Sequence, residues 1–462
     1  MGTIIKIIRP APARIVLLLL LFFLTATAAN AADNEKRLTL TEAVRAALEN
    51  NHALKAQKNA LAAKREDIGL ARSFLLPKIS LEERYLGTVN PTYAFMTKLN
   101  QERIDFADFT PASLNHPHTT SDFQTAISFE QPLFIKKANI GLAMSKTEAD
   151  ASAEDLQRKK EEIAFKVVQC YLMVGTAGEY IQVAEKAGED AREHQRLAEV
   201  RYQAGLGLYS DVLRAATAVA EAGQKSVSAG KNLRMAKRTL GLMLGSEAAI
   251  DVAEAPPPLP VRDREYLRTQ SLARRDVKSM ELRKENARNN IKLAEAGYFP
   301  YLGVGGVYQL NDHNKPFGSE GDSWQVMAFL KWELFDGTKR RHEKSKAQYQ
   351  ATEADEYLEG MKKMVSFQVE EAWLTLEEAK KNEELAQAAL KTAEEGRRLV
   401  RVRYEGALSP IVDMLAAQVS FDHARANLVA KENEYKLAIA NLSFAGGTIL
   451  ADLQQEEQGR IK

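Results

Sequence analysis

The sequence has a single cysteine, few aromatic residues and almost no net charge, and each of these shortages excludes a class of protein. One cysteine, Cys170, among 462 residues allows neither an internal disulfide nor a cysteine-based zinc site. The 63 Lys and Arg residues are balanced by 62 Asp and Glu residues, so no overall field would hold a nucleic acid. Charged residues at 27% and aromatics at 7%, with long stretches of Ala, Glu, Lys and Leu, favour long helices.

Motifs of catalysis, cofactor binding and metal binding are also missing from the sequence. The glycines at 303–306 lie inside an expected strand and no helix follows them, unlike the glycines of a phosphate-binding loop. His342 and Glu343 lack the second histidine of a zinc-binding helix, and loop histidines such as His116 and His118 are more often solvated than metal-bound. Neither a catalytic triad order nor a Walker lysine is present. We therefore expect neither an enzyme nor a bound cofactor or metal.

The N-terminal segment has the features of a secretory signal peptide. Lys6, Arg9 and Arg14 precede the apolar run 15–24, and Ala29–Ala31 forms an A-x-A cleavage site. A membrane anchor is the alternative, but the apolar core is shorter than the roughly 20 residues that a spanning helix needs. No run of that length follows residue 31. Removal of residues 1–31 leaves 60 basic and 62 acidic residues.

The rest of the sequence contains two copies of one plan. Residues 201–213 resemble residues 403–415 at an offset of 202. The same offset relates two apolar seams with heptad-like spacing, formed by Ile163, Val167, Cys170 and Val174 in one copy and Val365, Val369, Ala372 and Leu376 in the other. We expect a first repeat at 32–254, a stiff Pro-rich linker at 255–260, a second repeat at 261–450 and a polar tail at 451–462.

Each copy predicts a helix, two strands, a very long helix and a shorter helix. The expected ranges are 41–72, 78–89, 121–133, 138–202 and 211–244 in the first copy, and 263–296, 301–310, 323–335, 338–404 and 413–445 in the second. The long helix of the first copy would span roughly 98 Å, and its two shorter helices together roughly 99 Å. Two short helices stacked end to end would therefore match the long helix in a rod that carries strands at one end.

The expected strands alternate between apolar and polar residues. At about 10–13 residues they are long enough to cross a bilayer when tilted, which takes about 9–11. The pattern fits a barrel in lipid with a polar lumen, and it also fits a half-buried sheet in a soluble domain. Four strands cannot close a barrel alone. In lipid several chains would contribute, and three chains would supply twelve strands.

The order and duplication of these features resemble the TolC family of outer-membrane efflux proteins. The resemblance rests on helix–Pro–strand junctions at Pro77 and Pro300, on Gln131–Phe134 with its counterpart Glu333–Phe335, and on the paired Arg-Tyr segments. It implies a mainly α protein with a pair of β-hairpins. It further implies a homotrimer in which a 12-stranded outer-membrane β-barrel continues into a long periplasmic α-helical barrel.

The resemblance also implies a function and its partners. It predicts an exit duct of a tripartite efflux or type I secretion system in the outer membrane of a Gram-negative bacterium. The partners would be a periplasmic adaptor protein, an inner-membrane transporter and outer-membrane lipid. A periplasmic coiled-coil adaptor or scaffold is the alternative, since it would also carry a signal peptide and long helices.

A periplasmic gate is the site that the resemblance implies. It would use Asp413, Tyr404 and Asp211 at the tips of the helices, with three copies of Asp413 forming a cation-favouring ring. Ser409 and Ala416 stand where the family has a linking Arg and a second acidic ring. The alternative is that Asp211 and Asp413 only cap helix N-termini. We expect residues 90–120 to form an extracellular loop.

Overall fold

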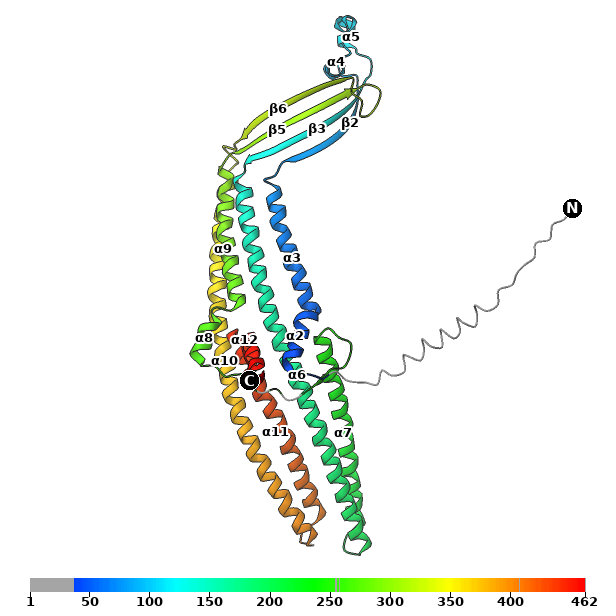
Figure 1. The fold of residues 1–462 in the computed structure, drawn as a ribbon, viewed down its shortest axis with the longest axis vertical. Coiled ribbons are helices and arrows are strands. Elements are labelled where there is room, and N and C mark those ends of the chain that lie inside the picture. Colours follow the sequence, from blue (N-terminus) through cyan, green and yellow to red (C-terminus); the bar gives the residue numbers. More distant parts are fainter. Residues whose placement is uncertain (1–36, 254–255, 257, 407, 462) are drawn as a thin grey trace, which may run out of the picture.

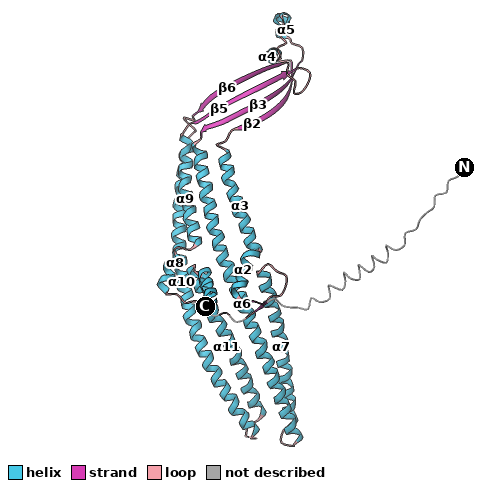
Figure 2. Ribbon diagram, in the orientation of Figure 1, coloured by secondary structure: helices cyan, strands magenta, loops and turns pink. Residues whose placement is uncertain are grey.

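The computed structural model describes residues 37–253, 256, 258–406 and 408–461, so the expected signal peptide lies outside the described residues. The described chain is elongated, with a four-stranded sheet near one end and long helices forming the remainder (Figure 1). Short helices lie beyond the sheet, and among the described residues strands occur only in the sheet and in one small pair near the middle (Figure 2). None of the described helices is long and apolar enough to cross a membrane.

The sheet contains two antiparallel hairpins in the order β2-β3-β5-β6. Its strands are β2 (Lys78–Thr88), β3 (Thr120–Phe134), β5 (Tyr301–Asp312) and β6 (Gly321–Lys331). The predicted extension of the last strand to residue 335 is wrong. Strand β5 begins at Tyr301 because Pro300 and a 3-10 turn at Ala296–Tyr298 precede it, and Lys331 pairs with Tyr301. Residues 332–335 therefore have no partner on that side, and Trp332 instead donates to the Tyr298 carbonyl at 3.0 Å.

The two faces of the sheet differ in polarity, as the alternation predicts. Residues that pair directly share a face, so one row contains Ile79, Phe129, Gly306 and Val326, and the next contains Leu81, Ile127, Tyr308 and Trp324. Most of these apolar side chains are exposed. The opposite face has Ser80, Ser128, Val307 and Gln325 in one row and Arg84, Gln124, Asn311 and Gly321 in another. The chain thus presents an uncovered apolar face and a mainly polar one.

Two long helices run the length of the helical part, and shorter helices stack end to end beside them. The long helices are α6 (Lys136–Gln203) and α10 (Lys339–Glu405). Those beside them are α2 (Leu40–Asn50), α3 (His52–Ser73), α7 (Tyr209–Met243), α8 (Arg264–Ser271), α9 (Arg275–Glu295) and α11 (Ile411–Gly446). Near the sheet the order is α3, α6, α9, α10, and farther away it is α7, α6, α11, α10. The sheet order β2-β3-β5-β6 matches the order α3, α6, α9, α10 of the helices that adjoin these strands in the sequence.

Two helices that the periodicity predicts as continuous are broken in the structure. The helix expected at 41–72 is interrupted at Asn51, whose Oδ1 accepts from the backbone of Ala53 and Leu54 and whose Nδ2 donates to the Met243 carbonyl at 2.8 Å. The helix expected at 263–296 is interrupted before Arg274. At Asn51 the side chain thus satisfies backbone groups that the break releases, whereas Arg274 makes no such cap. Neither break contains the Gly or Pro that would signal it.

The predicted polar tail is instead a helix, α12 (Ile449–Ile461), that packs into the middle of the molecule. Ile449 and Leu453 are buried there, and the fully buried Asp452 accepts from Arg262 Nε at 2.7 Å and Thr448 Oγ1 at 2.6 Å. The expected loop at 90–120 is also partly helical. It contains α4 (Pro91–Asn100), the 3-10 helix η1 (Phe106–Phe109) and α5 (Pro111–Asn115).

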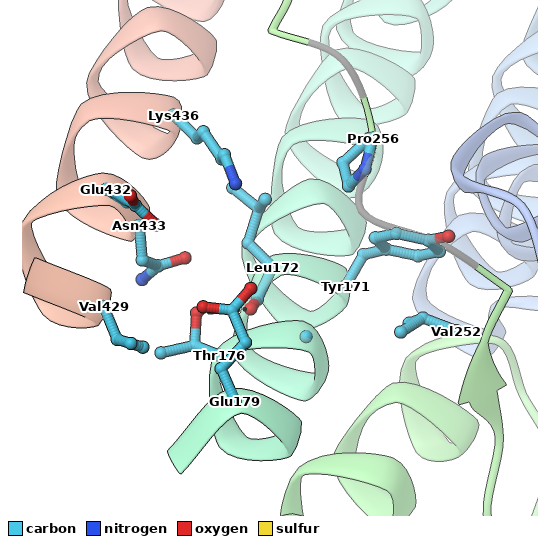
Figure 3. A pocket seen from close by; sticks show the side chains of 11 residues that line it. Tyr171, Leu172, Thr176, Glu179, Val252, Pro256, Val429, Glu432, Asn433 and Lys436 are labelled. Atoms are coloured by element: carbon cyan, nitrogen blue, oxygen red, sulfur yellow. Dashed lines mark hydrogen bonds between the residues drawn. The ribbon is translucent and has the colours of Figure 1, made fainter. Parts of the chain in front are cut away.

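The main core lies midway along the molecule, where parts of both copies meet. A short parallel pair, β1 (Arg37–Leu38) with β4 (Asp251–Val252), closes one side, and the Tyr171 hydroxyl donates to the Leu38 carbonyl at 3.0 Å. Pro256 lies beside Tyr171 and lines a small hollow together with side chains from α6 and α11 (Figure 3). The hollow between them is about 20 Å³, room for about one water molecule. This region is therefore packed core.

Buried charges hold this core together. Arg158 Nη1 lies 2.8 Å from Glu161 Oε2, and its guanidinium carbon is 4.0 Å from the centre of the Phe444 ring. Arg274 Nη2 lies 2.6 Å from Asp276 Oδ2, and Arg274 Nη1 donates to the Ala445 carbonyl at 3.1 Å. Two buried guanidinium groups thereby join α6 and the start of α9 to the end of α11.

We expect Arg274→Ala to destabilise the fold by about 3–5 kcal/mol, because it leaves Asp276 partly buried without its main partner. Arg268→Ala is the matched control: Arg268 pairs with Glu265 in an exposed position, where a pair contributes about 0–1 kcal/mol. Thermal unfolding followed by circular dichroism measures both. Equal shifts in the two variants would contradict a structural role for the buried pair.

Candidate functional site

Two related turns form the end of the molecule that lies farthest from the sheet (Figure 1). One joins α6 to α7 and the other joins α10 to α11. They close alike, because Leu206 N donates to the Arg201 carbonyl at 2.9 Å and Leu408 N donates to the Arg403 carbonyl at 2.8 Å. In the first turn Gly205 has φ +72°, a conformation that favours glycine. The duplicated sequence segments thus produce duplicated turns.

Tyr404 lies in a small apolar cluster just above these turns. It is 4% exposed and packs with buried residues from three neighbouring helices, namely Ala198 of α6, Ala215 of α7, and Ile411 and Met414 of α11. Its counterpart in the first copy, Tyr202, is 47% exposed and contacts the Tyr209 ring at 5.5 Å. Of the two equivalent tyrosines, only the predicted one therefore joins the two helix pairs.

Arg201 makes the principal polar contact to Tyr404, and we did not predict this residue for the site. Its Nη1 donates to the Tyr404 carbonyl, and its guanidinium carbon is 4.5 Å from the centre of the Tyr404 ring. Burial raises the pKa of the Tyr404 hydroxyl; Arg201 opposes this shift and the charge of Asp211 adds to it. Arg201 belongs to the duplicated Arg-Tyr segment, which marks both Arg201 and Arg403 as candidates. The duplication alone does not indicate which of the two contacts the tyrosine of the other copy.

Asp211 and Asp413 occupy equivalent places in the first turns of α7 and α11. Those helices have Leu208 and Pro410 as their N-caps, so the alternative interpretation of both aspartates as capping residues is wrong. Each is the third helical residue, where a carboxylate interacts favourably with the helix dipole. Asp211 is half-buried and acts on Tyr404 through its charge, whereas Asp413 is exposed. The structure thus brings Asp211 near Tyr404 and leaves Asp413 facing outward from the chain.

Ser409, at the position of the expected linking arginine, contributes no hydrogen bond here. Its Oγ is buried and, in the part of the chain that the structure describes, has no hydrogen-bonding partner. Ala416, at the second acidic-ring position, is exposed. Within one chain, Arg201 of α6 instead makes the contact to Tyr404 of α10.

A polar network joins α6, α10 and α11 a few turns above the tip. Gln418 Nε2 donates to Asp190 Oδ2 at 3.2 Å and to Asp422 Oδ1 at 2.9 Å, and Gln418 Oε1 lies 3.4 Å from His194 Nε2. Arg397 Nη1 pairs with Asp190 at 3.2 Å. Burial raises the pKa of Asp422, and the nearby charge of Asp190 raises it further. The network borders an open groove of about 1240 Å³ between α6, α7 and α11.

The arrangement has the form of a long helical wall with a sheet at one end and a packed tip at the other. The sequence pattern of the family described as outer membrane efflux protein matches residues 43–246 and 267–448, one range in each copy. The chain belongs to the outer membrane efflux protein family. As a member, it is an outer-membrane efflux channel that extends into the periplasm, and not the periplasmic adaptor or scaffold that was the alternative.

Individual relatives share the architecture over most of their length. Protein CyaE of Bordetella pertussis is 24% identical over 425 residues, covering 90% of this chain and 85% of that protein. A membrane protein from Pseudomonas aeruginosa superposes with a TM-score of 0.76 at 20% identity, covering 89% of this chain and 91% of that one. The outer membrane protein VceC of Vibrio cholerae gives 0.71 at 16% identity, covering 88% and 96%. The fold of this efflux protein is thus shared with known outer-membrane proteins.

We expect Asp422→Asn to stabilise this efflux protein at neutral pH by a few degrees in melting midpoint. An aspartate titrates near 3.9 when unfolded, and its raised pKa in the folded chain means that stability falls as pH rises from about 4 through the folded value. Asparagine removes that cost and still accepts from Gln418. The gain should therefore be present at pH 7 and shrink toward pH 4, as measured by thermal unfolding.

Asp190→Asn is the matched control in the same network. It weakens the pair with Arg397 and should lower stability by about 1 kcal/mol at pH 7. A loss of stability in both variants would show that ionised Asp422 stabilises the network, contrary to the expected sign.

Proposed function

We propose that this efflux channel acts as a homotrimer in which three sheets close one 12-stranded barrel. The observation that carries the proposal is the pair of open sheet edges. Within the described chain β2 pairs only with β3, and β6 pairs only with β5. An unpaired edge in lipid leaves backbone groups without partners at several kcal/mol each, so β6 of one chain must pair with β2 of the next. Three chains are the smallest ring that leaves an open lumen, because eight strands are filled by their own side chains.

The polarity of the two faces of the sheet supports the proposed barrel. The face with Ile79, Leu81, Trp324 and Val326 would contact lipid, and the face with Ser80, Arg84, Gln124 and Gln325 would line a wet lumen. The edge helices α3, α7 and α10 lie at the same two margins as the edge strands. A ring of three chains would therefore close the sheet and the helical wall with one set of contacts.

The chain would serve as a passive exit duct, with energy supplied by its partners. We infer a periplasmic adaptor and an inner-membrane transporter as those partners, in a tripartite efflux or type I secretion system. The periplasmic tip would be the closed end, held by the contact of Arg201 with Tyr404. In a trimer the exposed Asp413 side chains would form a single acidic ring, with Asp211 behind it.

Planar-bilayer conductance of residues 32–462, with the mass measured in detergent, tests this function. We expect a trimer with discrete, mostly low-conductance steps. Arg201→Ala should raise the open fraction, because it removes the link between the two turns. Arg403→Ala, the equivalent and exposed arginine of the second copy, should leave it unchanged. A monomer without conductance would contradict the proposed trimeric barrel.

Asp413→Ala should reduce the preference for cations in single-channel recordings, because three carboxylates at a narrow throat attract cations. Asp211→Ala is the control at the equivalent helix position and should change selectivity less, since Asp211 is half-buried. Reversal potentials in a salt gradient measure both variants. Unchanged selectivity in Asp413→Ala would rule out the ring.

A further inference from the structure

The two hairpins differ in the segment that joins their strands at the end of the sheet away from the helices. Residues 313–320 form the short connection of the second copy, whereas residues 89–119 form a long one in the first. The long connection carries α4, η1 and α5, which extend beyond the sheet (Figure 1). We name residues 91–115 the mouth segment. Its internal order is fixed by an ion pair of 2.6 Å between Lys98 and Asp108 and by an edge contact of the Phe95 and Phe109 rings.

The end of α4 is anchored by buried hydrogen bonds at the end of the sheet. Gln101 is 1% exposed, and its Nε2 donates to the Ser121 carbonyl at 2.8 Å and to Asp122 Oδ1 at 2.9 Å. The other carboxylate oxygen of Asp122 accepts from Asn311 Nδ2 at 2.7 Å. Asp122 and Asn311 share a face with Gln124, because Asn311 pairs with Gln124 and Asp122 is two residues from it. This is the mainly polar face of the sheet.

Gly321 shows independently that the end of α4 lies on that side of the sheet. It pairs with Asn311, so a side chain at this position would point to the polar side. A Cβ there would lie only 2.1 Å from the Asn100 carbonyl oxygen. The last residue of α4 thus occupies the space in front of the first residue of β6. The mouth segment starts from β2 and reaches the opposite edge strand.

The side of α4 that faces away from this anchor is apolar and uncovered. Ala94, Thr97 and Gln101 are buried, while Tyr93, Met96 and Leu99 are exposed at a spacing of three residues. Phe106 in η1 is 97% exposed, and Phe109 is also exposed. Apolar side chains gathered in this way on a soluble surface mark a contact with another apolar surface.

We propose that the mouth segments of three chains pack against one another and form an apolar constriction at the outer end of the channel. The proposal rests on the proposed trimer, in which the polar face surrounds the lumen. Lipid would contact the opposite face, so the surfaces facing the mouth segment are the other two copies of the same segment. α4 also ends on β6, the strand that adjoins the next chain. An apolar constriction of this kind closes a pore by excluding water.

Disulfide cross-linking tests the contact directly. Cys170, the single native cysteine, is buried, so Phe106→Cys supplies one accessible thiol per chain. Purified trimers of Phe106→Cys, oxidised with copper phenanthroline, should run largely as covalent dimers on non-reducing gels and return to monomers on reduction. Val326→Cys is the control: Val326 is 75% exposed on the apolar face of β6, and equivalent sites there would be separated by the barrel.

A second reporter cysteine distinguishes an unfavourable position of residue 106 from the absence of contact between the mouth segments. Met96→Cys places the thiol on the exposed side of α4, and cross-linking of either reporter supports the contact. Trimers that conduct but show no cross-link in either variant, or no more than Val326→Cys shows, would overturn the mouth constriction and leave the duct intact. Absence of a trimer in the unmodified protein would instead overturn the proposed function on which it rests.

Discussion

The unpaired backbone groups at the two edges of the sheet are the constraint on which the rest of the structure depends. Each hairpin satisfies its own inner edges, and β3 pairs with β5 to join the hairpins, which leaves the outer edges of β2 and β6 open. If the apolar face of a single chain contacts lipid, its open strand edges leave backbone groups in lipid without hydrogen-bonding partners. The proposed ring of three chains removes this conflict, and the helical wall repeats the order of the strands.

The two copies are connected by charge as well as by apolar packing. Midway along the wall, Arg158 and Arg274 bring the end of α11 against α6 and α9, and Asp452 of α12 holds Arg262 next to the linker. Buried ion pairs contribute little net stability, yet they are costly to break, so they fix one arrangement of the helices over its alternatives. Further ion pairs, such as Arg283 with Asp155 and Lys284 with Asp355, join α9 to α6 and α10 between this belt and the sheet.

Features that repeat along the chain were predictable, and features made by a single contact were not. The seam from Ile163 to Val174 and the alternation in β6 follow from periods that the sequence displays. The break at Asn51 depends on a carbonyl of Met243, far away in the sequence, and the burial of Asp452 depends on Arg262. Arg201 belongs to the same class, because its counterpart Arg403 is identical in sequence and exposed. Only the packing of four helices distinguishes the two arginines.

Two differences between the copies lie at opposite ends of the molecule. In the proposed trimer, two identical copies in each chain would form a tube of six equivalent parts without a narrow point. At the tip, Tyr404 is buried under Arg201 while Tyr202 is exposed, so only one of the two equivalent tyrosines joins the helix pairs. At the outer end, only the first copy carries the mouth segment. In the proposed duct, departures from the repeat at these two places would narrow an otherwise regular wall.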